Sequence, residues 1–329
     1  MNRQSIASPT RLLGCLALLM LPVLAACGSK ASTGASSNRL SPSEFAFLVG
    51  YGATAQDQPV RDHAEQILDQ RCMQARGFRY YTGGTGASSQ NGDTADDHSY
   101  VPGVGPTRTE ALAVAQRRQT GYHLYEAYAK QAPSNIPVND QYVRSLSAAE
   151  QARYQRALFG SQTKMKTIHT PTGGTYTYPT SGCVAHGQAQ LYGSVDAAQN
   201  VLTLPGYLLA KLGQDTAADS AVVAKNDDWS HCVSRATGVS FGSPHDIIQR
   251  LQREYTAQGA TQAVRNQEIS YAVADTRCQF RTGLAAVYGK VFRRRADQLA
   301  GSTRRLLLQS FEVEHRATAR AQQILASAS

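Results

Sequence analysis

The sequence predicts a mainly α fold, a multi-helix bundle with one small β-hairpin and a long glycine-rich loop. Ser or Thr followed three residues later by Glu or Asp recurs five times, which is the pattern of capped helix starts. Apolar residues also return at helical spacing, and Gly121, Gly160, Gly193 and Gly259 follow helical runs, as helix C-caps prefer. Five helix starts of one kind would be improbable in a sheet protein.

The first residues have the pattern of an export signal. Arg3 and Arg11 accompany an apolar stretch over residues 12–24, which is too short for a transmembrane helix of roughly 20 apolar residues. Residues 24–27 read Leu-Ala-Ala-Cys, the lipobox of bacterial lipoproteins. We therefore expect residues 1–26 to be removed as a lipoprotein signal peptide and Cys27 to carry acyl chains such as palmitate. The alternative is an ordinary secretory signal with a cysteine after it by chance.

The rest of the chain is expected to form a tether and one domain. Residues 27–39 contain the lipidated cysteine and a Ser-, Gly- and Ala-rich segment, which spans roughly 19 Å root-mean-square if it is flexible. Residues 40–329 form a single helical domain, with 40–215 and 216–329 as two halves that could be related. The net charge of +9 falls to about +7 without the two signal arginines (9 − 2 = 7). This organisation predicts a lipid-anchored protein on the extracytoplasmic face of the cell membrane, where nucleic acid is not an expected partner.

In the first half, a capping box with proline at the first helical position starts a helix at residues 41–44. Residues 60–72 repeat apolar side chains on one helical face. Residues 82–106, a run of Gly, Ser, Asp and Pro, predict the long loop. Residues 107–110 and 147–150 carry two further capping patterns.

The hairpin and the second half follow. Residues 165–178 have a Pro-Thr-Gly-Gly turn in the middle and alternating Thr and Tyr after it, which predicts the hairpin. Weaker caps at 216–219 and 243–246 have Asp in place of Glu. Residues 269–288 carry two apolar stripes on opposite sides, which predicts one helix packed on both sides. Residues 292–324 predict a last, long antiparallel helix at the edge of the bundle.

Four cysteines follow Cys27, and an even number in an exported chain indicates two disulfides. Their wide spacing disfavours a zinc site, and three pairings are open to them. The block after Cys72 resembles the block after Cys232, because each cysteine near a helix end is followed by a glycine and alternating large side chains. If each block closes its own bridge, the pairs are Cys72–Cys183 and Cys232–Cys278.

Four short blocks of the chain carry a resemblance to known proteins: Cys72-Met73 with Gly77-Phe78, Gly182-Cys183 with Leu191-Tyr192-Gly193, Trp229 with Cys232, and residues 269–284. These blocks resemble a group of uncharacterised secreted lipoproteins of actinomycetes, the high-GC Gram-positive bacteria. The resemblance covers most of the chain in scattered pieces. It implies export, lipidation and a helical domain with two disulfides, and it assigns no catalytic residue.

One motif suggests catalysis. Residues 238–242 read Gly-Val-Ser-Phe-Gly, the G-x-S-x-G pattern of a serine nucleophile, and Asp275 and His315 follow in the order that hydrolases use. The mechanism requires a strand before Ser240, whereas the sequence predicts a helix there. An envelope serine hydrolase using Ser240 is therefore an alternative, not the expected function.

The remaining chemistry is sparse. The eight histidines form no H-E-x-x-H or i, i+4 pair, so neither a metal nor another cofactor is predicted. Basic side chains crowd the last helix and could bind anionic lipid or wall polymer, or form a solvated face held by local ion pairs; they are Lys290, Arg293, Arg294, Arg295, Arg304 and Arg305. We expect a membrane-anchored protein without enzymatic activity that binds or assists at the cell envelope. A solute-binding receptor is a third hypothesis, although the alternating strands and helices of two-lobed receptors are absent.

Overall fold

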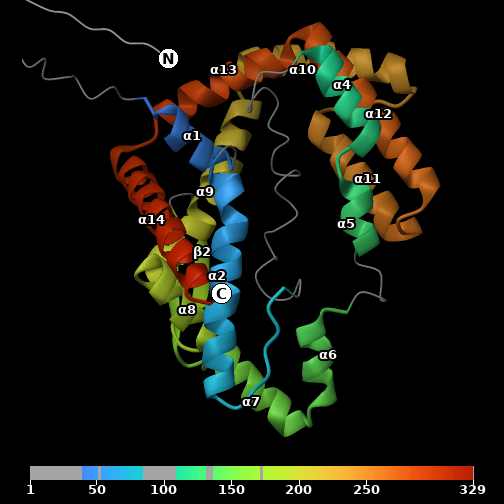
Figure 1. Ribbon diagram of the computed structural model, residues 1–329. Coiled ribbons are helices and arrows are strands. Elements are labelled where there is room, and N and C mark those ends of the chain that lie inside the picture. The colour runs from blue at the N-terminus through green and yellow to red at the C-terminus, as the bar shows by residue number, and fades with distance from the viewer. Residues whose placement is uncertain (1–38, 51–52, 84–108, 131–135, 171–172, 329) are drawn as a thin grey trace, which may run out of the picture. The chain divides into compact units, whose positions relative to one another are not determined.

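The fold is mainly α, as predicted. A computed structural model describes residues 39–50, 53–83, 109–130, 136–170 and 173–328 (Figure 1). Residues 38–329 form one compact unit. The predicted signal peptide, Cys27, the tether up to residue 38 and most of the predicted loop over 82–106 lie outside the described residues.

The first half of the chain holds the long helix α2, several shorter helices and the hairpin. The elements are α1 (Pro42–Val49), α2 (Ala53–Ala75), α4 (Glu110–Thr120), α5 (Leu124–Lys130), α6 (Val138–Ser145), α7 (Ala148–Phe159), β1 (Met165–His169), β2 (Thr175–Pro179) and α8 (Cys183–Tyr192). The two strands pair antiparallel, with Thr167 opposite Thr177. Tyr178 in β2 donates a 2.6 Å hydrogen bond to Asp196, which docks the predicted hairpin on the helix that follows α8.

The second half consists of helices. They are α9 (Val195–Ala217), α10 (Ser220–Thr237), α11 (Pro244–Gln258), α12 (Gln262–Thr282), α13 (Leu284–Asp297) and α14 (Gly301–Ala326). Among the described residues no helix is both long and apolar enough to cross a membrane.

The strongest predicted caps are confirmed. Ser41 and Ser147 each accept a hydrogen bond from the backbone of the glutamate three residues later, and that glutamate bonds back to the backbone N–H of the serine. Ser243 caps α11 with Pro244 at the first helical position. Reciprocal capping satisfies two donors that a helix start otherwise leaves without partners, which is why the first two boundaries follow from sequence alone, and Pro244 marks the third.

Two predicted helix starts are wrong in position. The cap before α4 is Thr109, whose hydroxyl accepts from Leu112 N, and not the expected residue at position 107. Thr216 lies inside α9, and Asp219 caps α10 instead. In both cases a second Ser, Thr or Asp close by competes for the cap, and the tertiary packing of the helix decides between them.

Two predicted long helices are each broken. The helix expected over 269–288 ends at Thr282, because Gly283 takes a left-handed conformation (φ 72°) and ends α12 before α13 begins. The helix expected over 292–324 is interrupted between Asp297 and Gly301, so α13 and α14 run in different directions (Figure 1). The apolar stripes continue across both breaks, so helical periodicity gave no sign of them.

The buried apolar residues form three clusters. The first joins α1, α2, α8, α9 and α14 around Leu48, Leu204 and Leu307. The second joins α10 to α13 around Trp229, which is fully buried. The third lies at the end of α2, where Met73 packs beside α7 and α8.

These clusters do not follow the proposed halves 40–215 and 216–329. α14 packs along α2, and α4 packs along α12, so each half supplies helices to the other's core. Tyr122 and Leu124, from the first half, belong to the second cluster. The two halves therefore do not pack as separate units, whatever the origin of the two cysteine blocks.

Both disulfides are present, and they join Cys72 to Cys183 and Cys232 to Cys278, the pairing preferred from the sequence. The first connects α2 to the start of α8, and the second connects α10 to α12. Two disulfides indicate an oxidising, extracytoplasmic environment.

Candidate functional site

Ser240 does not lie on a nucleophile turn. It follows α10 after Gly238, which ends that helix in a left-handed conformation, so a helix and not a strand leads into it. Its hydroxyl contacts the hydroxyl of Ser234 at 3.3 Å. Asp275 accepts hydrogen bonds from the side chains of Tyr122 and Trp229, at 2.8 and 2.9 Å, and His315 packs its ring on Phe311. The three residues of the motif are therefore not assembled into a catalytic triad.

Two fully buried carboxylates on α12 are structural. Glu268 accepts the backbone N–H groups of Tyr122, Leu124 and Tyr125 at 2.6, 3.0 and 3.1 Å, and the hydroxyl of Tyr255 at 2.5 Å. It thereby holds the turn between α4 and α5 against α12. Buried charges persist in proteins when such hydrogen bonds replace water. Within the described residues no group of three or more His, Cys, Asp or Glu is placed to hold a metal ion.

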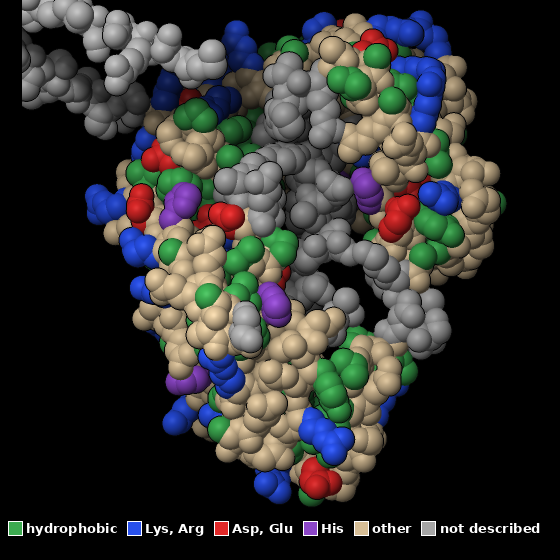
Figure 2. Space-filling model, viewed as in Figure 1, with side chains coloured by type: hydrophobic (Ala, Val, Ile, Leu, Met, Phe, Trp, Pro, Cys, Tyr) green, Lys and Arg blue, Asp and Glu red, His purple; other side chains and the backbone are tan. Residues whose placement is uncertain are grey.

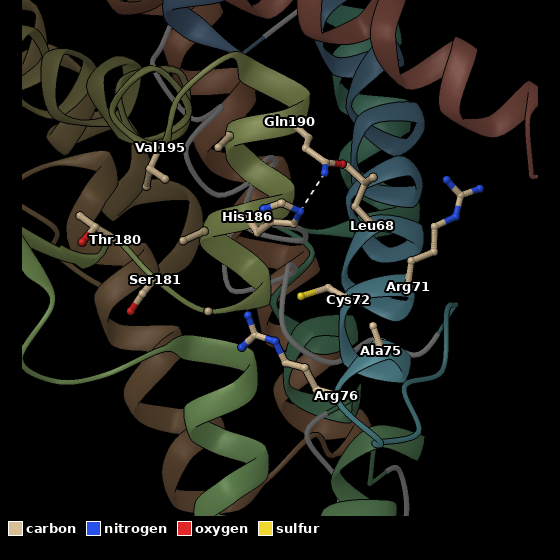
Figure 3. A pocket seen from close by; sticks show the side chains of 13 residues that line it. Leu68, Arg71, Cys72, Ala75, Arg76, Thr180, Ser181, His186, Gln190 and Val195 are labelled. Atoms are coloured by element: carbon tan, nitrogen blue, oxygen red, sulfur yellow. Dashed lines mark hydrogen bonds between the residues drawn. The ribbon is translucent and has the colours of Figure 1, made fainter.

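A groove between α2 and α8 is the best candidate for a binding site (Figure 3). Its volume is ≈ 780 Å³, inside the roughly 300–1,000 Å³ that is usual for ligand sites. Thr180 to Gly182, between the hairpin and α8, close one end, and Val195 at the start of α9 also lines it. The Cys72–Cys183 disulfide crosses between the two helices at the groove and fixes their spacing.

The groove has an apolar strip with polar and cationic edges. At about 100° per residue, Arg71 and Arg76 are about 140° apart around α2, with Leu68, Cys72 and Ala75 between them. Figure 3 shows the two arginines leaving α2 in different directions. The strip therefore runs between two positive charges.

The facing wall of the groove, formed by α8, also has an apolar strip with polar side chains beside it. Ala185 and Ala189 of α8 continue the apolar strip, and His186 and Gln190 lie beside it with Gln190 Nε2 2.8 Å from His186 Nε2 (Figure 3). No residue that lines the groove is Asp or Glu. The electrostatics consequently favour an anionic ligand.

The two arginines differ in how they are held. Arg76 donates to the carbonyl oxygen of Ala157 at 2.8 Å, near the end of α7, so it also supports the fold. Arg71 is exposed and makes no hydrogen bond or ion pair within the part of the chain that is described. Arg71 can therefore be exchanged without removing a structural contact.

Further along α2, two carboxylates are buried against α8. Glu65 and Asp69 are one helical turn apart and only 7% and 4% exposed. Asp69 Oδ1 has no hydrogen-bond partner, and a Cβ on Gly187 would lie 3.1 Å from that oxygen, so the glycine lets the two helices approach here. Burial raises the pKa of Glu65 to about 7, and burial together with the charge of Glu65 raises the pKa of Asp69 to about 8.

The basic residue that precedes this pair on α2 is engaged with α14 instead. Arg61, one turn earlier on α2, is engaged with Glu314 at 2.7 Å and with the Thr318 hydroxyl at 2.8 Å, both on α14. At neutral pH Asp69 is therefore expected to be mostly protonated and Glu65 about half protonated, and the pair stabilises the α2–α8 contact best in its protonated form.

The predicted basic residues serve partly to hold the fold. Arg294 and Arg295 both contact Asp219 at 3.0 and 3.2 Å, and Arg293 and Arg304 bond to the backbone at the start of the domain. Lys290 and Arg305 are exposed and without a partner in the described structure. The alternative of a solvated helix face with local ion pairs thus describes Arg293, which pairs with Asp297 at 3.3 Å, whereas Arg294 and Arg295 pair with a distant segment.

No model of a known protein family, no curated protein and no solved structure matches the chain.

Proposed function

We propose that this chain is a lipid-anchored, extracytoplasmic protein without enzymatic activity that binds an anionic ligand in the groove between α2 and α8. The observation that carries the proposal is the lining of the groove, which combines Arg71, Arg76 and His186 with an apolar strip and includes no carboxylate. The solute-binding hypothesis is thereby narrowed to one site and one sign of charge.

The proposed location and lipid anchor are supported mainly by the sequence. The lipobox that ends at Cys27 supports acylation, and the two disulfides agree with a chain that folds outside the cytoplasm. Mass spectrometry of the intact, membrane-extracted protein tests this part directly. We expect a chain that begins at Cys27 and carries the mass of two or three acyl chains; an uncleaved or unacylated chain would refute the anchor.

The groove restricts the ligand's chemistry. Guanidinium groups bind the oxyanions of phosphate and carboxylate. At one end of the groove the Ser181 hydroxyl accepts from Ser161 N and can donate its own proton to a ligand, whereas the Thr180 hydroxyl donates to Lys164 O. The strip of Leu68, Ala75 and Ala189 can cover an apolar or carbon-rich body. We infer a small phosphate- or carboxylate-bearing molecule of the envelope as ligand.

Calorimetric titration of the full chain in detergent tests the groove with four probes: inorganic phosphate, glycerol phosphate, acetate and neutral glycerol. The ionic strength is held constant with chloride, so that general screening does not count as binding. We expect saturable binding of glycerol phosphate, or of acetate if the site prefers carboxylates, and none of glycerol.

Arg71→Gln should weaken that binding about tenfold, since a hydrogen bond to a charged group contributes about 1.5 kcal/mol or more. Arg253→Gln is the matched control, because Arg253 on α11 is also exposed and without a partner among described residues. If none of the anions binds, or if both variants bind alike, the groove is not the site.

A further inference from the structure

The domain begins inside a cluster of positive charges. Leu40 N donates to Asp297 at 2.9 Å, Arg293 donates to Leu40 O, and Arg304 donates to Arg39 O at 2.8 Å. Arg293 also lies over the ring of Phe45, with its guanidinium carbon 4.4 Å from the ring centre. These contacts fix the first residues of the domain to the end of α13 and the start of α14.

We call this region the basic corner, and it has a marked charge imbalance. Asp297 pairs with Arg293, Asp219 pairs with Arg294 and Arg295, and Glu44 caps α1 nearby. These three carboxylates stand against seven cations, which gives 7 − 3 = +4. The cations are Arg39, Lys290, Arg293, Arg294, Arg295, Arg304 and Arg305. Figure 2 shows Lys and Arg side chains gathered where α1 and α13 lie in Figure 1.

Two of these cations are placed against the preference of their own helix. Arg304 and Arg305 lie at the start of α14, which has no acidic residue in its first turn. A helix N-terminus carries partial positive charge, so cations there cost stability unless another group compensates. Arg305 has no such group among described residues, which suggests a partner outside the chain.

We propose that the basic corner docks on an anionic lipid surface. This inference depends on acylation of Cys27 in the proposed function above. Cys27 precedes Arg39 by twelve residues, which reach at most about 40 Å when fully extended. The chain therefore enters the domain through the same corner that carries the charge, and the bilayer that holds Cys27 is the anionic partner within reach.

Docking on lipid accounts for the free cations better than a soluble partner does. Each Lys or Arg close to an anionic surface contributes a similar share of the electrostatic attraction to that surface. This attraction falls off within a Debye length of roughly 8–10 Å. Lys290, Arg294 and Arg305 are exposed and come from two helices, so the positive charge extends beyond the hollow that Arg304 and Arg305 line and forms a broad face. The lipid-facing side is then defined by α13 and the first turn of α14.

The test uses the acylated full chain in vesicles, after its acyl mass has been measured. Lysines are modified with a water-soluble acylating reagent and counted by peptide mass spectrometry. We expect Lys290 to be protected on vesicles of phosphatidylglycerol and phosphatidylcholine, but not on phosphatidylcholine alone. Lys164, exposed before β1, should react equally on both and serves as the internal control.

A pair of variants separates charge from structure. Arg305→Glu should lower the protected-to-reactive ratio of Lys290 roughly fivefold or more, since it removes one cation's attraction and adds repulsion. Arg253→Glu makes the same change of charge on α11 and should leave the ratio unchanged. Equal reactivity of Lys290 on both vesicles, or equal effects of the two variants, would overturn the docking. An acylated protein with a reactive Lys290 would leave the anchor and the groove intact.

Discussion

The buried carboxyl pair on α2 makes the stability of the protein depend on pH. Asp69 has a raised pKa in the folded protein, about 8 against 3.8. Between these two values the folded state binds a proton that the unfolded state has released, so stability falls as pH rises and levels off above about pH 8. Asp69→Asn imitates the protonated side chain at every pH and should remove the part of this dependence that Asp69 contributes.

The magnitude follows from the two pKa values of Asp69. Between pH 5 and pH 9 the proton on Asp69 ceases to stabilise the folded state. The lost stabilisation corresponds to about 3 pKa units, which is about 4 kcal/mol of unfolding free energy. Glu65, with a pKa of about 7, adds to the same trend. Because the two carboxyls repel each other, the effects of Asp69→Asn and Glu65→Gln should add to less than their sum.

Urea unfolding from pH 5 to pH 9, with both disulfides intact, measures this effect. The fluorescence of Trp229, the chain's one tryptophan and fully buried, reports unfolding. The wild type should lose about 4 kcal/mol or more across the range, because Glu65 adds to the contribution of Asp69, and Asp69→Asn should keep only the part that Glu65 contributes. Asp228→Asn, an exposed control that pairs with Lys225, should keep the wild-type slope. A wild-type stability that is constant or rises with pH would refute the reasoning.

Three further outcomes are expected. Gly121→Ala should destabilise the protein by about 2 kcal/mol or more in urea unfolding, since its φ is 58° and a Cβ would lie 2.6 Å from Glu268 Oε1; a neutral result would mean that the turn between α4 and α5 can move away. Replacing Cys72 and Cys183 together by Ser should cost about 5 kcal/mol for a 111-residue separation, less any native strain, and an unchanged urea midpoint would contradict that. A fluorophosphonate probe should label neither the wild type nor Ser240→Ala, whereas labelling of the wild type alone would restore the hydrolase.

The sequence was most informative where a local hydrogen bond decides a boundary. The caps at Ser41 and Ser147 need only residues within one turn, so the pattern and the structure agree. Thr216 has the same local chemistry but continues α9, because its position is buried and held by tertiary packing. The break after Asp297 also involves a contact from a distant segment, Leu40 N with Asp297, whereas the break after Thr282 follows from the left-handed Gly283.

The groove could not be predicted for a related reason. Arg71 and His186 are separated by more than 100 residues, and each alone resembles an ordinary exposed residue on a helix. The preferred pairing of their neighbours Cys72 and Cys183 was the sequence signal that these two segments lie side by side. The buried state of Asp69 had no such signal, because an acidic residue in a helix is usually exposed.

The contacts between the two ends of the domain affect how it folds after export. Arg61 on α2 reaches its partners Glu314 and Thr318 on α14 across more than 250 residues, and Leu40 reaches Asp297 across 257. The segment nearest the proposed anchor is thus exported first, yet the helices that cover it emerge last. Such long-range pairing slows folding and leaves apolar surface uncovered in the meantime. A chain truncated before α14 would keep its export signal and proposed anchor but would expose α2. Folding is therefore complete only when the last helix has packed.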